Sequence, residues 1–149
     1  MATGEQVAIL RGKLTTKVHA RDTLRICQWY NDAQVMIENN NHGHAVIQWF
    51  EENDYEHYLL EGHNGKVGWT SNTLGKALMY DTTAEAAKDG ETIIHDYETY
   101  TQLVSIEKAT LRAPEGEMDD LADAYALALA GIRLNPGVMV IPRAKARLG

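Results

Sequence analysis

Short apolar segments typical of strands alternate along this sequence with longer segments typical of helices. The run AQVMI at residues 33–37 does not alternate between apolar and polar residues. A strand of this kind is covered on both faces, as in sheets that carry helices on either side. The alternation of strands and helices therefore predicts an α/β domain.

The predicted elements account for most of the 149 residues. Strands are predicted at residues 7–11, 33–37, 58–61, 66–69, 92–95 and 106–110, the third and fourth of these forming a hairpin. Helices are predicted at residues 16–31, 44–52, 72–88, 97–104 and 119–131. A chain of this length suits one domain, which we assign to residues 1–132. Residues 133–149 contain Pro136, Gly137 and Pro142 and are predicted to be a basic, extended tail.

Composition excludes several classes of protein. Cys27 is the only cysteine, so the chain is not a disulfide scaffold. Hydrophobic residues make up 44% of the chain, which excludes a disordered protein. No apolar run approaches the roughly 18 to 20 residues of a membrane span, and the first residues lack the pattern of a secretory signal. We therefore expect a protein of the cytoplasm with no membrane partner.

The net charge of -7 is unevenly distributed. Residues 1–32 carry five basic and three acidic side chains, residues 133–149 carry four basic and no acidic ones, and the stretch between carries five basic and 18 acidic ones. An acidic chain does not usually hold nucleic acid through a broad basic face. It can act on nucleic acid if its acids gather around metal ions while its basic ends contact phosphates. The alternative is an acidic, solvated surface.

Glu38 directly follows the predicted buried strand at residues 33–37. Functional groups of α/β sheets gather at the carboxyl ends of strands. An acid in this position is exposed enough to ionise, and the strand holds it rigidly enough to direct its carboxylate toward a ligand. Glu38 is therefore a candidate site residue, and the alternative is a surface acid that merely ends a strand.

Three acids, Asp119, Asp120 and Asp123, lie at the start of the last predicted helix. The free N–H groups and the dipole of a helix favour an acid there, which is sufficient reason for one of them. Asp123 lies four residues after Asp119 and three after Asp120, so the acids share one side of the helix. Carboxylates placed in this way repel one another unless a cation lies among them, and hard divalent cations prefer carboxylate oxygens.

Other kinds of site have weaker signals. The histidines lack the rigid spacing and cysteine partners typical of zinc; they are His42, His44, His57 and His63. The sequence contains neither a nucleotide-binding P-loop motif nor a G-x-S-x-G motif. Cys27 lies on the apolar face of a predicted helix and is expected in the core. The three tryptophans can stack on bases, but packing is the simpler explanation for each.

Five segments, in their order along the chain, resemble the C-terminal nuclease domain of the large terminase subunit of tailed bacteriophages. They are WYNDA, AQVMIENNNHGHAVI, GKVGWTSNTLGKALM, DGETIIHDYETYTQLVSI and APEGEMDDLADAYALALA. The similarity extends from about residue 3 to residue 132. The most specific parts are E-N-N-x-x-G, G-W-x-S with a lysine after it, and the final helix that begins with two aspartates.

The resemblance implies a ribonuclease H-like fold, a mixed sheet flanked by helices. It implies that Glu38, Asp119 and Asp120 hold two Mg²⁺ or Mn²⁺ ions, with Asp123 as a further ligand. Such a centre cuts concatemeric duplex DNA during packaging, and two metals suit phosphodiester hydrolysis. The implied partners are duplex DNA, the terminase small subunit and the portal, in a bacterial host cytoplasm with a phage or prophage gene. The residues expected to orient Glu38 or contact the DNA backbone are Asn39, Asn40, Lys76 and Arg21.

The family pattern begins with a strand that carries the first catalytic aspartate, and no aspartate precedes Asp22 here. The resemblance therefore implies an N-terminally truncated domain, without the ATPase half, in which residues 7–11 match the third strand. Three explanations stay open: a split or truncated gene product, a fragment, or a second copy or partner chain that completes the fold. Two rival functions also stay open, namely an inactive accessory that binds packaging proteins and a resolvase-like nuclease that acts as a dimer on branched DNA.

Overall fold

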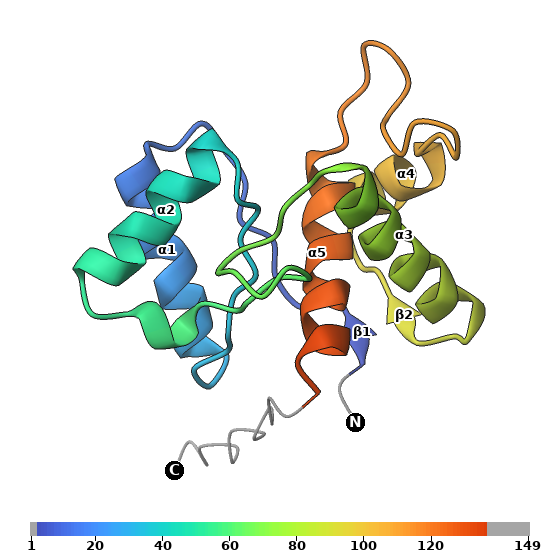
Figure 1. Ribbon diagram of the computed structural model, residues 1–149. Helices are drawn as coiled ribbons and strands as arrows, with labels where there is room; N and C mark the ends of the chain where they lie inside the picture. Colours follow the sequence, from blue (N-terminus) through green and yellow to red (C-terminus); the bar gives the residue numbers. More distant parts are fainter. Residues whose placement is uncertain (1–2, 137–149) are drawn as a thin grey trace.

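The computed structural model describes residues 3–136, and its helices lie in two lobes (Figure 1). One lobe contains α1 (Thr16–Trp29), α2 (Asn41–Glu52) and the short 3-10 helix η1 (Glu56–Tyr58). The other contains α3 (Thr73–Lys88), α4 (Tyr97–Ser105) and α5 (Asp120–Leu134). Two short parallel strands, β1 (Gly4–Glu5) and β2 (Thr92–Ile93), pair beside α5. The prediction of a mixed α/β chain is confirmed.

All five predicted helices are present, with ends that differ by at most three residues. Helix α5 continues to Leu134, so the first two residues of the predicted tail are helical. One of them, Arg133, donates a hydrogen bond of 2.6 Å to Glu91. Asn135 and Pro136 follow the helix, and the predicted tail from residue 137 on lies outside the described residues. None of the described helices has the length and apolar character needed to cross a membrane.

Helices α2 and α3 begin in the same way, because both start with the pattern Asn-x-x-Gly. The side chain of Asn40 accepts a hydrogen bond of 2.8 Å from the N–H of Gly43, and Asn72 does the same for Gly75. A Cβ atom at Gly43 would lie 1.7 Å from the carbonyl oxygen of Glu38. Only glycine leaves room for this close approach, which holds Glu38 against the first turn of α2.

The predicted strand at residues 33–37 is an extended segment without a regular ladder. It forms isolated parallel bridges, Val35 with Leu59 and Glu38 with Trp69. The predicted hairpin is likewise reduced to bridges from Glu61 to Val67 and Gly68. The partner segment bends between these contacts, so each part of it pairs with only one or two residues.

Two further strand predictions were wrong. Residues 7–11 are irregular and Val7 is 59% exposed, because no described segment pairs with them. The chain pairs earlier, at Gly4, whose N–H donates to the carbonyl oxygen of Glu91 at 2.8 Å. Residues 106–110 contain only a bridge between Glu107 and Arg112, and the strand predicted at 92–95 ends at Ile93.

The extended segment at residues 33–39 separates the cores of the two lobes. Val35 and Ile37 pack against the first core, which α1, α2 and Tyr58 form around Phe50. Met36 packs against the second core, which α3 and α5 form around Trp69. Successive side chains thus face opposite lobes. The prediction of a strand buried on both faces is thus met only in part: both faces pack against a core, but the residues are half-buried and Gln34 is exposed.

Candidate functional site

The clearest polar cluster of the second lobe joins α3 to α5. Lys76 Nζ lies 3.0 Å from Oδ1 and 2.7 Å from Oδ2 of Asp123. The hydroxyl of Tyr80 donates to Oδ1 of the same carboxylate at 2.5 Å. Lys76 and Tyr80 are four residues apart, so both lie on the face of α3 that meets α5. The Lys76 and Asp123 side chains are only 16% and 17% exposed.

The electrostatics of this cluster show which other acids lie close to it. Burial raises the pKa of Asp123, hydrogen bonds from Lys76 and Tyr80 lower it, and the charge of Asp119 raises it again. Burial and the hydrogen bond to Asp123 raise the pKa of Tyr80, and the charges of Asp119 and Glu38 raise it further. The negative charges of Glu38, Asp119 and Asp123 therefore converge on one phenol, although they come from the central segment and α5.

Asn40 holds the carboxylate of Glu38 in place. Its Nδ2 donates to Oε2 of Glu38 at 2.9 Å, while its Oδ1 accepts from the N–H of Gly43. One amide side chain thus caps α2 and orients an acid. Asn39 is exposed and contributes its backbone N–H, which donates to the carbonyl oxygen of Trp69 at 2.7 Å.

Gln102, and not an aspartate side chain, caps the start of α5. Its Oε1 accepts hydrogen bonds from the N–H groups of Leu121, at 2.8 Å, and Ala122, at 3.2 Å. Asp119 Oδ2 instead accepts from the N–H of Ala113 at 3.2 Å, and Asp120 is exposed. Sequence reasoning missed both Gln102 and Tyr80. Tyr80 is four residues after Lys76, so the sequence could have indicated that the two share a helix face. No sequence pattern near Gln102 indicates that it caps α5.

The described residues only partly fit the expected metal centre. Within residues 3–136, no group of three or more His, Cys, Asp or Glu side chains could hold a metal ion. Asp123 already forms an ion pair with the ammonium group of Lys76. Glu38 Oε1 and Asp119 Oδ1 make no hydrogen bond inside this range. Each of these two carboxylates thus keeps one oxygen without a hydrogen bond among residues 3–136, and the pair alone does not make up a two-metal centre.

The residues expected to contact DNA lie apart from one another. Lys76 is engaged with Asp123, whereas Arg21 lies on α1, where its Nε is 3.4 Å from Oδ1 of Asp22. The histidines are also dispersed. His42 lines a cavity beside Glu38, and His63 packs edge-on against Trp69.

That cavity, of about 440 Å³, lies between the two lobes. The extended segment from Val35 to Glu38 forms one wall, and side chains from α1, α2 and α5 form the others. Glu38, Asn40 and His42 lie on the same lining, so the cavity opens beside the acidic cluster.

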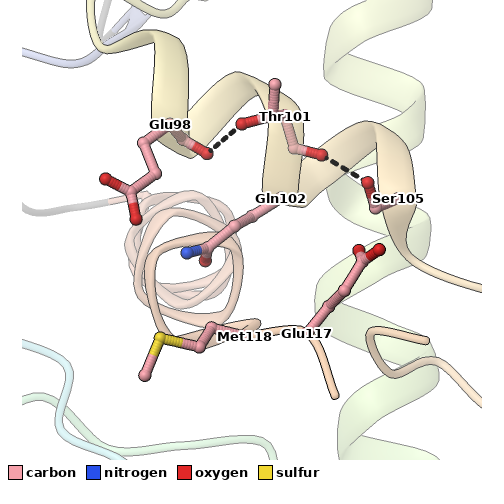
Figure 2. A pocket seen from close by; sticks show the side chains of 6 residues that line it. All are labelled: Glu98, Thr101, Gln102, Ser105, Glu117 and Met118. Carbon is pink, nitrogen blue, oxygen red and sulfur yellow. Dashed lines mark hydrogen bonds between the residues drawn. The ribbon is translucent and has the colours of Figure 1, made fainter. Parts of the chain in front are cut away.

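A smaller pocket of about 260 Å³ lies between α4 and the loop before α5 (Figure 2). Its hydroxyl groups are already used: Thr101 donates to the carbonyl oxygen of Glu98, and Ser105 donates to that of Thr101. The Oε1 of Gln102 caps α5. The pocket therefore carries no set of free, converging groups.

No protein-family model matches the sequence, and no curated protein matches it significantly. The arrangement of Glu38, Asp119, Asp123, Lys76 and Tyr80 is the observation from which a function can be argued. Glu38 lines the cavity between the lobes, and its charge and that of Asp119 reach Tyr80, which is hydrogen-bonded to Asp123.

Proposed function

We propose that this chain provides part of a metal-dependent DNA endonuclease centre of the terminase type, within a ribonuclease H-like domain. One observation carries the proposal: Glu38 lines the cavity between the lobes, and its charge and that of Asp119 reach Tyr80, whose hydroxyl donates to Asp123 of α5. These are acids that the resemblance assigns to the metal site. Carboxylates from different elements rarely converge without a reason, because their mutual repulsion costs stability.

In this proposal Glu38 and Asp119 hold the divalent cation. Bound Mg²⁺ or Mn²⁺ stabilises charge on a scissile phosphate and lowers the pKa of an attacking water. Asn40 orients Glu38, and Gln102 caps α5 so that Asp119 and Asp120 remain available. A further carboxylate from outside residues 3–136 is required, from a second copy or from another polypeptide. Duplex DNA, the small subunit and the portal are the proposed partners, in a host cytoplasm.

A second candidate function is a non-catalytic packaging accessory. The observation that favours it is the ion pair between Lys76 and Asp123. A lysine ammonium inside the acidic cluster supplies a positive charge there, so the cluster has less need of a metal. In that case the acids contribute to the contact between α3 and α5 and take no part in chemistry.

Nicking of supercoiled plasmid in the presence of Mn²⁺ separates the two functions. The full chain is compared with Glu38→Gln and Asp119→Asn, and with Glu117→Gln as a matched control in the exposed loop before α5. For a nuclease we expect both site variants to lose at least about 100-fold in rate, since the metal provides most of the electrostatic stabilisation. Glu117→Gln should nick at the rate of the unchanged chain.

The opposite outcome is equally informative. If no variant and no unchanged chain nicks the plasmid, or if nicking survives both site substitutions, this chain alone is not the nuclease. The accessory function then becomes the better explanation, and pull-down against portal and small-subunit proteins is the next measurement.

A further inference from the structure

The cavity between the lobes has the volume of a site for a small organic molecule, at about 440 Å³. Its lining residues come from α1, from the extended segment, from the beginning of α2 and from α5. Ligand sites occur preferentially where two such units of a protein meet. The cavity is therefore a candidate binding site in its own right, apart from any metal.

One part of the lining is apolar. Val46 lines the cavity from α2, and Leu127 lines it from α5. Met36 adds its side chain from the extended segment, and Leu14 adds another from the residues before α1. Such walls favour a ligand with an apolar body, because the ligand loses contact with water when it packs against them.

The other part of the lining is polar, and Glu38 gives it a negative charge. Asn40 donates to Oε2 of Glu38 at 2.9 Å, so the direction of the carboxylate is fixed. Asp119 adds negative charge in the same region, since its charge and that of Glu38 both reach Tyr80. Among the described residues that line the cavity, none is a lysine or an arginine. This end of the cavity therefore favours a positively charged group.

The remaining polar side chains of the lining suit the same kind of group. They are hydroxyls and imidazoles, from Thr16, His19, Thr23 and His42. A hydroxyl and an uncharged imidazole can each accept a hydrogen bond, and an ammonium group has three to donate. A bare metal ion would leave the apolar walls without a partner, and an anion would be repelled by Glu38. A ligand with an apolar body and a cationic end matches both parts of the lining.

We propose that the cavity between the lobes binds a small organic amine. The ammonium group of the amine pairs with the carboxylate of Glu38, and its apolar body packs against Val46 and Leu127. The proposal goes beyond the proposed function and does not depend on it, because this binding requires neither DNA nor a divalent metal ion.

Isothermal titration calorimetry on the full chain, with EDTA present and DNA absent, tests the proposal. The probes are phenylpropylamine, phenylpropanol and phenylpropionate, which share one apolar body and differ in the charge of one end. At about pH 8 an alkylamine is charged and an ordinary imidazole is not. We expect the amine to bind at least about tenfold more tightly than the alcohol, since a hydrogen bond to a charged group is worth more than a neutral one. The carboxylate probe should bind most weakly.

Two variants show which part of the cavity each half of the ligand contacts. Glu38→Gln keeps the size of the side chain and removes its charge, so the amine should lose at least about tenfold in affinity while the alcohol is unaffected. Ala124→Phe places a ring in the cavity from an exposed position of α5, and should weaken both probes. Ala128→Phe is the matched control, because Ala128 is exposed on the same helix and does not line the cavity. Equal unfolding midpoints by circular dichroism show that the variants are folded.

Three results would overturn the proposal. The first is equal affinity for the three probes, which means that the charge of the ligand is not recognised. The second is amine binding that Ala124→Phe or Glu38→Gln does not weaken, which places the amine elsewhere. The third is no binding of the amine at up to about 10 mM, a concentration at which a complex with a Kd of about 1 mM would be mostly formed. Because DNA and metal are absent, each of these results is independent of the outcome of the nicking assay.

Discussion

Lys76 and Asp123 form an ion pair that links α3 to α5, with Nζ 3.0 Å and 2.7 Å from the two carboxylate oxygens. Both side chains are mostly buried. Burial raises the pKa of Asp123, whereas the hydrogen bonds from Lys76 and Tyr80 lower it and so favour the charged carboxylate. The pair therefore influences both the stability of the second lobe and the charge of the acidic cluster.

Lys76→Met is expected to destabilise the fold by about 1–3 kcal/mol at neutral pH, because a desolvated carboxylate loses its main partner. The pKa of Asp123 then rises further. A carboxyl with a raised pKa binds more protons when folded, so the stability of the variant recovers as the pH falls toward about 4. Urea unfolding at about pH 7 and about pH 5 measures this. Lys88→Met, an exposed change on the same helix, is the control and should show neither effect.

The Cys27 thiol is expected to be unreactive in the folded protein. Burial raises its pKa to about 11, so almost no thiolate is present at neutral pH and the sulfur is covered by the first core. A thiol reagent such as DTNB should label the chain only at the rate of unfolding. The chain in concentrated urea should react within the mixing time. Prompt, complete labelling without denaturant would show that α1 does not bury this thiol against α2.

Asp96 links the start of α4 to the segment after β1, because its N–H donates to Oε1 of Gln6 at 3.0 Å. Its carboxylate accepts from the N–H and the hydroxyl of Thr99, at 2.7 Å and 2.8 Å, and these bonds lower its pKa. A carboxyl with a lowered pKa stabilises the fold above its unfolded pKa, and this contribution is lost as the pH falls through the folded value. The unfolding midpoint of Asp96→Ala should thus lie below that of the unchanged chain from neutral pH down to about 4. The gap should close in stronger acid; a gap independent of pH would mean that the charge of Asp96 does not stabilise the fold.

Gly43→Ala is expected to destabilise the protein by about 1–3 kcal/mol, because the new methyl group would lie 1.7 Å from the Glu38 carbonyl oxygen. Gly75→Ala is the matched control, with a methyl group 1.9 Å from the carbonyl oxygen of Thr70 and a similar expected cost. Chemical denaturation measures both. Only Gly43→Ala should also slow plasmid nicking, if the chain nicks, since it alone displaces Glu38. Equal loss of nicking in both would assign the effect to stability.

The sequence predicted helices well because the information for a helix is local. The apolar periodicity of α1 places Ala20, Leu24 and Cys27 in the core, whereas the cap at Asn40 was missed and α2 was predicted to begin at His44. The absence of alternation in residues 33–37 predicted burial on both faces, and the structure shows packing on both faces with only partial burial. Strands were predicted less well, because residues 7–11 have the composition of a strand but lack a described neighbour to pair with.

By itself, therefore, the sequence determined which segments are helical, to within three residues at their ends, and which acids were candidates for a site. Tertiary structure alone decided that Lys76 pairs with Asp123, 47 residues away, and that Gln102 caps α5 from another helix. It also decided that, among residues 3–136, only the odd-numbered residues of the segment at residues 33–39 form backbone hydrogen bonds. Helix signals depend on neighbours three or four residues apart, whereas ion pairs, remote caps and strand edges depend on which elements pack together in space.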